Sequence, residues 1–124
     1  MKEIIAIFIG GGLGSLTRFG LAKLINSLHN FHFPLGTFVV NIIACFALGF
    51  LIGFADHKQL LSPATKLFWT VGFCGGFSTF SAFSSETLTL FQQGHNASLI
   101  LYVLASVLLC VTATFCGLLI AERI

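Results

Sequence analysis

Two long apolar segments without a charged residue place the strongest constraint on the fold of this chain. Residues 33–55 form a run of 23 and residues 98–121 a run of 24. A helix needs about 20 consecutive apolar residues to cross the hydrocarbon core of a bilayer. Only 8% of all residues are charged, against about 25% in an ordinary soluble domain. The sequence therefore predicts an all-α integral membrane protein that is surrounded mainly by lipid.

Two further segments complete a predicted bundle of four transmembrane helices. Residues 67–85 contain no charge, and residues 4–28 contain only Arg18 and Lys23, of which Lys23 can extend to the membrane interface. We expect one transmembrane domain, residues 1–124, with helices over about 3–28, 33–55, 64–92 and 97–121.

The short connections between these segments predict the topology. Short loops force neighbouring helices to run antiparallel, so four crossings place both termini and the second connection on one side of the membrane. This side collects most of the positive residues, which favours the cytoplasm. Arg18 and Lys23 oppose that bias, and so small a difference is compatible with insertion in both orientations. The residues on the favoured side are Lys2, Lys58, Lys66 and Arg123.

The third segment carries an unusual run of glycine, hydroxyl and phenylalanine residues, GFCGGFSTFSAFSSE over residues 72–86. Adjacent Gly75 and Gly76 weaken a helix, and we expect a break within residues 75–79. Backbone groups freed inside a membrane are tolerated only where protein or a water-filled cavity satisfies them. Uncharged carbonyls at such a break suit an alkali cation. A helix that is only kinked, with its hydroxyl groups bonded to the preceding turn, is the alternative.

Beyond the expected break, aromatic and hydroxyl side chains occupy neighbouring stripes of the helix. Phe80 and Phe83 share one face, and Ser81 and Ser84 share the adjacent one. The edge of an aromatic ring is positive, and a hydroxyl group donates a hydrogen bond. These groups could together replace the hydration shell of a small anion. Phenylalanine also fills membrane cores without any such role, and the chain has 15 of them.

Small and polar residues are expected to hold the helices together. The glycines within residues 10–14, with Gly49 and Gly53, allow close approach of helices. Asn41 stands alone in an apolar run, so its amide must find a partner inside the bundle. The fourth segment has a polar stripe with a spacing of four residues, which either binds a neighbouring helix or lines a narrow path. The stripe consists of Tyr102, Ser106, Cys110 and Thr114.

The sequence argues against several classes of function. Arg18 and Glu86 are the only ionisable residues away from the connections, and we expect them to reach an interface or to bind partners. The middle of the helices has no carboxylate for proton-coupled transport. No hydrolase motif such as HExxH or GxSxG occurs, so we predict no enzyme and no catalytic residue. A net charge of +2 gives no reason to expect nucleic acid, and four cysteines without a CxxC pair argue against zinc and disulfides.

Three motifs follow one another along the chain: GGLGSLTRF at residues 11–19, PLGTFVVN at residues 34–41 and the glycine-rich run at residues 72–86. In this order and spacing they resemble the Fluc or CrcB family of fluoride channels over essentially the whole chain. The resemblance implies passive, selective export of fluoride across a bacterial inner membrane. It also implies a homodimer of four-helix subunits in antiparallel orientation, with dual topology and two pores.

The resemblance further implies roles for individual residues. A structural sodium ion at the dimer interface would be held by the backbone carbonyls of Gly75 and Ser78, and Arg18 would lie in a vestibule. Ser78 and Ala82 replace threonines that are frequent in the family, and Ala82 removes a hydroxyl group between the two phenylalanines. The implied fluoride pore comprises Asn41, Phe80, Phe83, Ser81, Ser84, Thr114 and Tyr102.

Two other classes of protein fit the prediction of four helices. Small multidrug antiporters have the same length and dual topology, but they need a carboxylate in the first helix, where this chain has only Glu3 at the end. A scaffold subunit without transport would explain the glycines and hydroxyl groups as packing residues. It leaves the run at residues 72–86 unexplained, and absence of ion flux through the purified protein would favour it.

Overall fold

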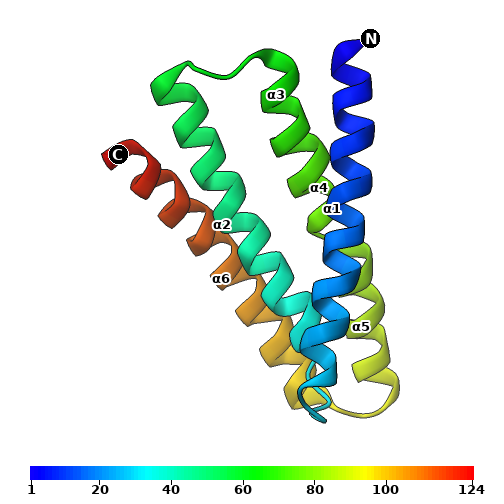
Figure 1. Ribbon diagram of the computed structural model, residues 1–124. Coiled ribbons are helices and arrows are strands. Elements are labelled where there is room, and N and C mark those ends of the chain that lie inside the picture. Colours follow the sequence, from blue (N-terminus) through cyan, green and yellow to red (C-terminus); the bar gives the residue numbers. More distant parts are fainter.

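The computed structural model describes all residues from Met1 to Ile124 and is entirely helical (Figure 1). Its three longest helices are α1 (Lys2–Ser27), α2 (Leu35–Lys58) and α6 (Asn96–Arg123), and each is long and apolar enough to cross a bilayer. Large apolar side chains cover the outside, as lipid requires. The predicted all-α membrane architecture is thereby confirmed.

The remaining crossing segment is built from four pieces. It begins with α3 (Pro63–Leu67), where the Ser62 hydroxyl accepts a hydrogen bond from the Thr65 amide at 3.2 Å. After η1, which is π-helical, and the short α4, the chain is extended at Ser78 (ψ 159°) and Thr79 (φ −153°, ψ 122°). The break therefore falls inside the predicted interval of residues 75–79. The other bounds are Phe68–Cys74 for η1, Gly75–Phe77 for α4 and Phe80–Gln92 for α5.

The crossing segments alternate in direction. Figure 1 shows both chain ends and the α2–α3 connection at one end of the molecule, and the α1–α2 and α5–α6 connections at the other. Helices α2 and α6 are therefore parallel to each other and antiparallel to α1 and to the interrupted segment. This is the arrangement that the short connections predict.

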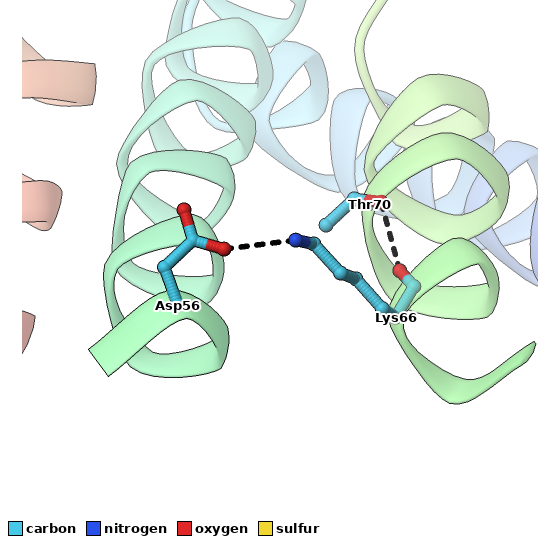
Figure 2. A network of polar contacts seen from close by, with 3 residues as sticks. All are labelled: Asp56, Lys66 and Thr70. Atoms are coloured by element: carbon cyan, nitrogen blue, oxygen red, sulfur yellow. Dashed lines mark hydrogen bonds and ion pairs between the residues drawn. The ribbon is translucent and has the colours of Figure 1, made fainter. Parts of the chain in front are cut away.

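A small polar network joins the end of α2 to the start of the interrupted segment (Figure 2). Lys66 Nζ donates to Asp56 Oδ1 at 2.9 Å, and Thr70 Oγ1 donates to the Lys66 carbonyl oxygen at 2.8 Å. The charged side chains are 44% and 64% exposed, so water screens the pair and it contributes about 0–1 kcal/mol. The network orients this connection more than it stabilises the fold.

Glycines bring the helix backbones into direct contact. A Cβ atom at Gly49 would overlap the Thr114 carbonyl oxygen, and one at Gly117 would overlap the Phe46 carbonyl oxygen, so α2 and α6 touch along their backbones. A Cβ atom at Gly14 would likewise overlap a carbonyl oxygen of η1. Because lipid is as apolar as the side chains, such close packing is what holds membrane helices together. The close packing predicted from the glycines of the first two segments is confirmed.

We expect Gly49→Ala to destabilise the bundle by about 1–3 kcal/mol, because the added methyl group would collide with backbone atoms that cannot rotate away. Thermal unfolding of the purified protein in detergent would measure the effect. Gly12→Ala is the matched control, since nothing lies within 4 Å of a Cβ atom there and alanine favours a helix more than glycine does. Equal melting temperatures for the two variants would contradict the contact between the α2 and α6 backbones.

Candidate functional site

A cavity of about 320 Å³ lies where α2, α5 and α6 surround the interruption of the third segment. Its wall contains amide, hydroxyl, thiol, aromatic and aliphatic side chains, and no carboxylate, ammonium or guanidinium group. The polar and aromatic lining residues are Asn41, Cys45, Ser78, Thr79, Phe80, Phe83, Ser106 and Cys110. The cavity is therefore open to one side of the bundle, and its mainly apolar wall carries a few polar groups and no charge.

The Asn41 side chain satisfies the backbone where the helix is interrupted. Its Nδ2 donates to the Thr79 carbonyl oxygen at 3.1 Å, and its Oδ1 accepts from the Thr79 amide at 2.8 Å. The side-chain oxygen thus accepts from the Thr79 N–H, which has no helical acceptor, and the side-chain nitrogen adds a bond to the Thr79 carbonyl oxygen at the N-cap of α5. The partner expected for Asn41 is the broken backbone itself.

The interruption is capped on both sides. Where α5 begins, the Thr79 hydroxyl accepts from the Ala82 amide at 3.1 Å. Where α4 ends, Arg18 Nε reaches over from α1 and donates to the Gly76 carbonyl oxygen at 3.2 Å. A cation at the carbonyl end of a helix also interacts favourably with the helix dipole. Arg18 therefore has the partner that its position in the membrane demands.

Two carbonyl groups lose their helical partners through this capping. In a continuous helix the Thr79 amide would bond to Gly75 and the Ala82 amide would bond to Ser78. Both amides are directed elsewhere, to Asn41 Oδ1 and to the Thr79 hydroxyl. Gly75 is exposed, and open space surrounds the position of its missing Cβ atom. These carbonyl oxygens thus have spare acceptor capacity, as has that of Phe77, whose helical partner would be the Ser81 amide.

The two phenylalanines of α5 lie side by side at the cavity. Their ring centroids are 5.4 Å apart, with an interplanar angle of 39°. Phe83 also contacts the Tyr102 ring, at 5.0 Å between centroids, whereas Phe80 is 78% exposed. Phe83 is thus held by its neighbours, and Phe80 presents its ring to whatever lies beside the chain.

Glu86 joins three helices through both oxygens of its carboxylate. Thr37 Oγ1 donates to Oε1 at 2.7 Å, and the Tyr102 hydroxyl donates to Oε2 at 2.9 Å. Both donors are buried, with Tyr102 0% exposed. Glu86 was predicted only to need a partner, and Thr37 was not singled out. The one signal in the sequence is that Thr37 precedes Asn41 by one helical turn.

The polar stripe of α6 faces a matching row of residues on α2. Gly49 lies against the Thr114 backbone and Gly53 against the Leu118 backbone, and in both pairs the partners are 65 positions apart. Because α2 and α6 are parallel, the same register continues from turn to turn. It pairs Cys45 with Cys110, Asn41 with Ser106 and Thr37 with Tyr102.

Ser106 is a functional candidate that the sequence analysis left within the stripe. It lines the cavity and is 7% exposed, yet its Oγ has no hydrogen-bond partner in the protein. A buried hydroxyl group without a partner is uncommon in folded proteins and needs an explanation. A ligand or a water molecule in the cavity would supply one.

The structure gathers only some of the predicted site residues at the cavity. Asn41, Ser78, Phe80 and Phe83 line it. The other six lie outside the lining: Arg18, Gly75, Ser81, Ser84, Thr114 and Tyr102, of which Tyr102 contacts Phe83 from behind. Ser81 and Ser84 are exposed on α5, and the Thr114 hydroxyl donates to the carbonyl oxygen of Cys110 at 3.0 Å.

Comparison with known proteins gives full-length matches. The sequence model of the CrcB-like protein family, Camphor Resistance (CrcB), matches residues 5–118. A fluoride-specific ion channel FluC of Azobacteroides pseudotrichonymphae is 41% identical over 98% of both chains. Relatives with the same name from Bacteroides fragilis (strain YCH46) and Pyrococcus abyssi are 44% and 40% identical, each over 99% of this chain and 98% of the relative.

We expect Asn41→Asp to destabilise the protein by about 1–3 kcal/mol, because the aspartate keeps an acceptor for the Thr79 amide but turns its second oxygen toward the Thr79 carbonyl oxygen. Thermal unfolding in detergent would measure the loss. Asn26→Asp is the matched control, since Asn26 Oδ1 only accepts, from the Gly36 amide at 3.0 Å, and aspartate can do the same. If both variants melted alike, the pairing of Asn41 with the interruption would be in doubt.

Proposed function

Because this chain belongs to the CrcB family of ion channels, as its motifs predicted, we propose that it is a fluoride-selective channel that passively releases fluoride from the cytoplasm. The chain is a multi-pass membrane protein, and its family is not one of enzymes. The observation that carries the proposal is the uncharged cavity beside the interrupted helix, where a few hydroxyl and amide groups stand in a mainly apolar wall. It offers hydrogen-bond donors to an anion at membrane depth.

The donors in this cavity are suited to a strongly hydrated anion. A channel must replace the water around an ion without binding the ion so tightly that it cannot leave. Ser106 has a hydroxyl proton without a partner, and the Asn41 amide has a second N–H besides the one given to Thr79. The ring edges of Phe80 and Phe83 add weak positive potential. No cation lines the wall to trap the anion.

Glu86 acts in this proposal as a positioning residue. Its carboxylate accepts from the Tyr102 hydroxyl at 2.9 Å, and the Tyr102 ring supports the Phe83 ring. The two hydroxyl donors from α2 and α6 also compensate for the burial of its charge. The carboxylate therefore fixes the back of the cavity, while its charge stays paired outside the lining.

We further propose a homodimer in antiparallel orientation with two pores. A single chain leaves the pathway side of α5 uncovered, because Phe80, Ser81 and Ser84 are all exposed. An identical subunit in the opposite orientation would cover this face and close each cavity from the side. The small difference in positive charge between the two sides of the chain is compatible with insertion in both orientations.

A structural sodium ion fits two of the carbonyl groups that lose their helical partners at the break. Gly75 and Ser78 would hold it, because their carbonyl oxygens lack the Thr79 and Ala82 amides. Gly75 is also exposed in the single chain, so a second subunit could approach it. The ion would compensate for these acceptors between the subunits, in a region without water, and it would not be transported.

We expect purified protein in liposomes to release fluoride and to exclude chloride. Phe80→Ile and Asn41→Asp should each slow fluoride efflux by about tenfold or more, since an efflux barrier raised by about 1.4 kcal/mol gives that factor. A fluoride electrode would measure the rates. Phe8→Ile, at an exposed position on α1 away from the cavity, should leave them unchanged.

Two results of that experiment would count against the channel. The absence of fluoride efflux from well-folded protein in sodium buffer would favour the scaffold alternative. Equal slowing by Phe8→Ile and Phe80→Ile would show that loss of any exposed ring disturbs the protein, so the pore would not be located at α5.

We expect the chain to insert in both orientations. A short tag after Ile124 should be cleaved by an external protease in about half of the chains in sealed vesicles, because the positive-inside bias is weak. Gln59→Lys with Leu60→Lys adds charge to the exposed α2–α3 connection and should shift the chains to one orientation. The double substitution should also abolish fluoride efflux, because chains that all insert in one orientation cannot form antiparallel dimers. Cleavage of all or none of the tags in the unmodified protein would contradict dual topology.

A further inference from the structure

Two cysteine thiols face each other in the wall of the cavity. The register set by the contacts of Gly49 with Thr114 and of Gly53 with Leu118 places Cys45 of α2 opposite Cys110 of α6. Both residues also line the cavity and are partly exposed to it. The pair therefore combines proximity with access.

The other two cysteines differ from this pair. Cys74 is only 3% exposed, and Cys116 is exposed on α6; neither lines the cavity. Fluoride conduction as proposed above uses hydroxyl, amide and aromatic groups and gives the two cavity thiols no role. They form a separate chemical feature of the same space.

We propose that Cys45 and Cys110 form a two-coordinate binding site for a soft divalent cation, of which Hg²⁺ is the probe. Soft metal ions select thiolate ligands. Binding replaces two S–H bonds by two S–metal bonds, and the two protons leave to solvent, so no oxidant or reductant takes part. The product is a neutral bis-thiolate.

The surroundings favour this class of ion over others. The neutral product of a divalent ion adds no net charge to a cavity without charged groups, whereas a monovalent soft ion between two thiolates would leave a buried negative charge. Zinc requires about four ligands, and the chain has no group of three or more histidine, cysteine or acidic side chains arranged to hold a metal. Two opposed thiols suffice only for a linear site.

The test is the intact mass of the folded protein in detergent after addition of one equivalent of Hg²⁺ and an excess of 2-mercaptoethanol. The unmodified chain should keep one mercury with the loss of two hydrogens, because two thiols on rigid helices bind it as a chelate. Cys45→Ser and Cys110→Ser should each retain it about 100-fold less well or worse, since linked binding adds about 10²–10⁴ in affinity.

Cys116→Ser and Cys74→Ser are the controls and should retain mercury as the unmodified chain does. Matching elution volumes in gel filtration would show that all four variants remain folded. The proposal would be overturned if Cys110→Ser kept as much mercury as Cys116→Ser. It would also be overturned if the bound mercury carried a mercaptoethanol adduct, or if Cys74→Ser abolished binding. Transport plays no part in this readout, so its outcome is separate from that of the efflux experiment.

Discussion

The pairing of one side-chain amide with the backbone N–H and C=O groups of one extended residue is the interaction on which the site depends. A backbone break inside a membrane leaves polar groups that no water can reach, and each unsatisfied group costs several kcal/mol. Asn41 bonds to both the amide and the carbonyl of Thr79, and so makes the extended conformation tolerable. The direction of α5, the position of its phenylalanines and the unpaired carbonyl groups all follow from that break.

The contact between α2 and α6 determines which side chains face the interruption of the third segment. At Gly49 and Gly53 the helices touch along their backbones, and their parallel register carries the contact into Cys45 and Asn41. Glycine packing thus also positions side chains, because it holds the polar row of α2 opposite the polar stripe of α6. The cavity forms where the row reaches the interruption, and the amide that caps the break belongs to that row.

Much of this fold could be predicted from the sequence, because hydropathy and loop length dictate the spans and their directions. The break was also predicted, from Gly75 and Gly76, yet both glycines remain helical and the chain becomes extended at Ser78 and Thr79. The reason is capping: the Thr79 hydroxyl caps α5, which a glycine has no side chain to do, and the Thr79 backbone bonds to Asn41. Glycine content indicates where a helix is weak. The residue at which the helix is interrupted is set by the hydrogen-bond partners available to the freed backbone groups.

What could not be predicted is which face of one helix meets which face of another. Periodicity identified the polar stripe of α6. The matching row on α2 could not be recognised in the same way, because Cys45 and Gly49 are not polar residues. The contact of Glu86 with Thr37 likewise joins residues 49 positions apart, a distance over which a single sequence carries no pairing signal. The assignment of sodium to Gly75 and Ser78 came from family resemblance, and no pattern of spacing could have given it.

The placement of charge explains how one small bundle can hold ionisable groups at membrane depth and still offer a neutral cavity. Arg18 is bound at the carbonyl end of α4, and Glu86 is bound by two hydroxyl groups from neighbouring helices. Each charge is compensated where it stands, and neither belongs to the lining. The potential in the cavity is therefore set by dipoles of amide, hydroxyl and ring groups, which in the proposed channel attract an anion from several sides without fixing it at one. A charged lining would bind more strongly but conduct less, since an ion must leave the site as readily as it enters.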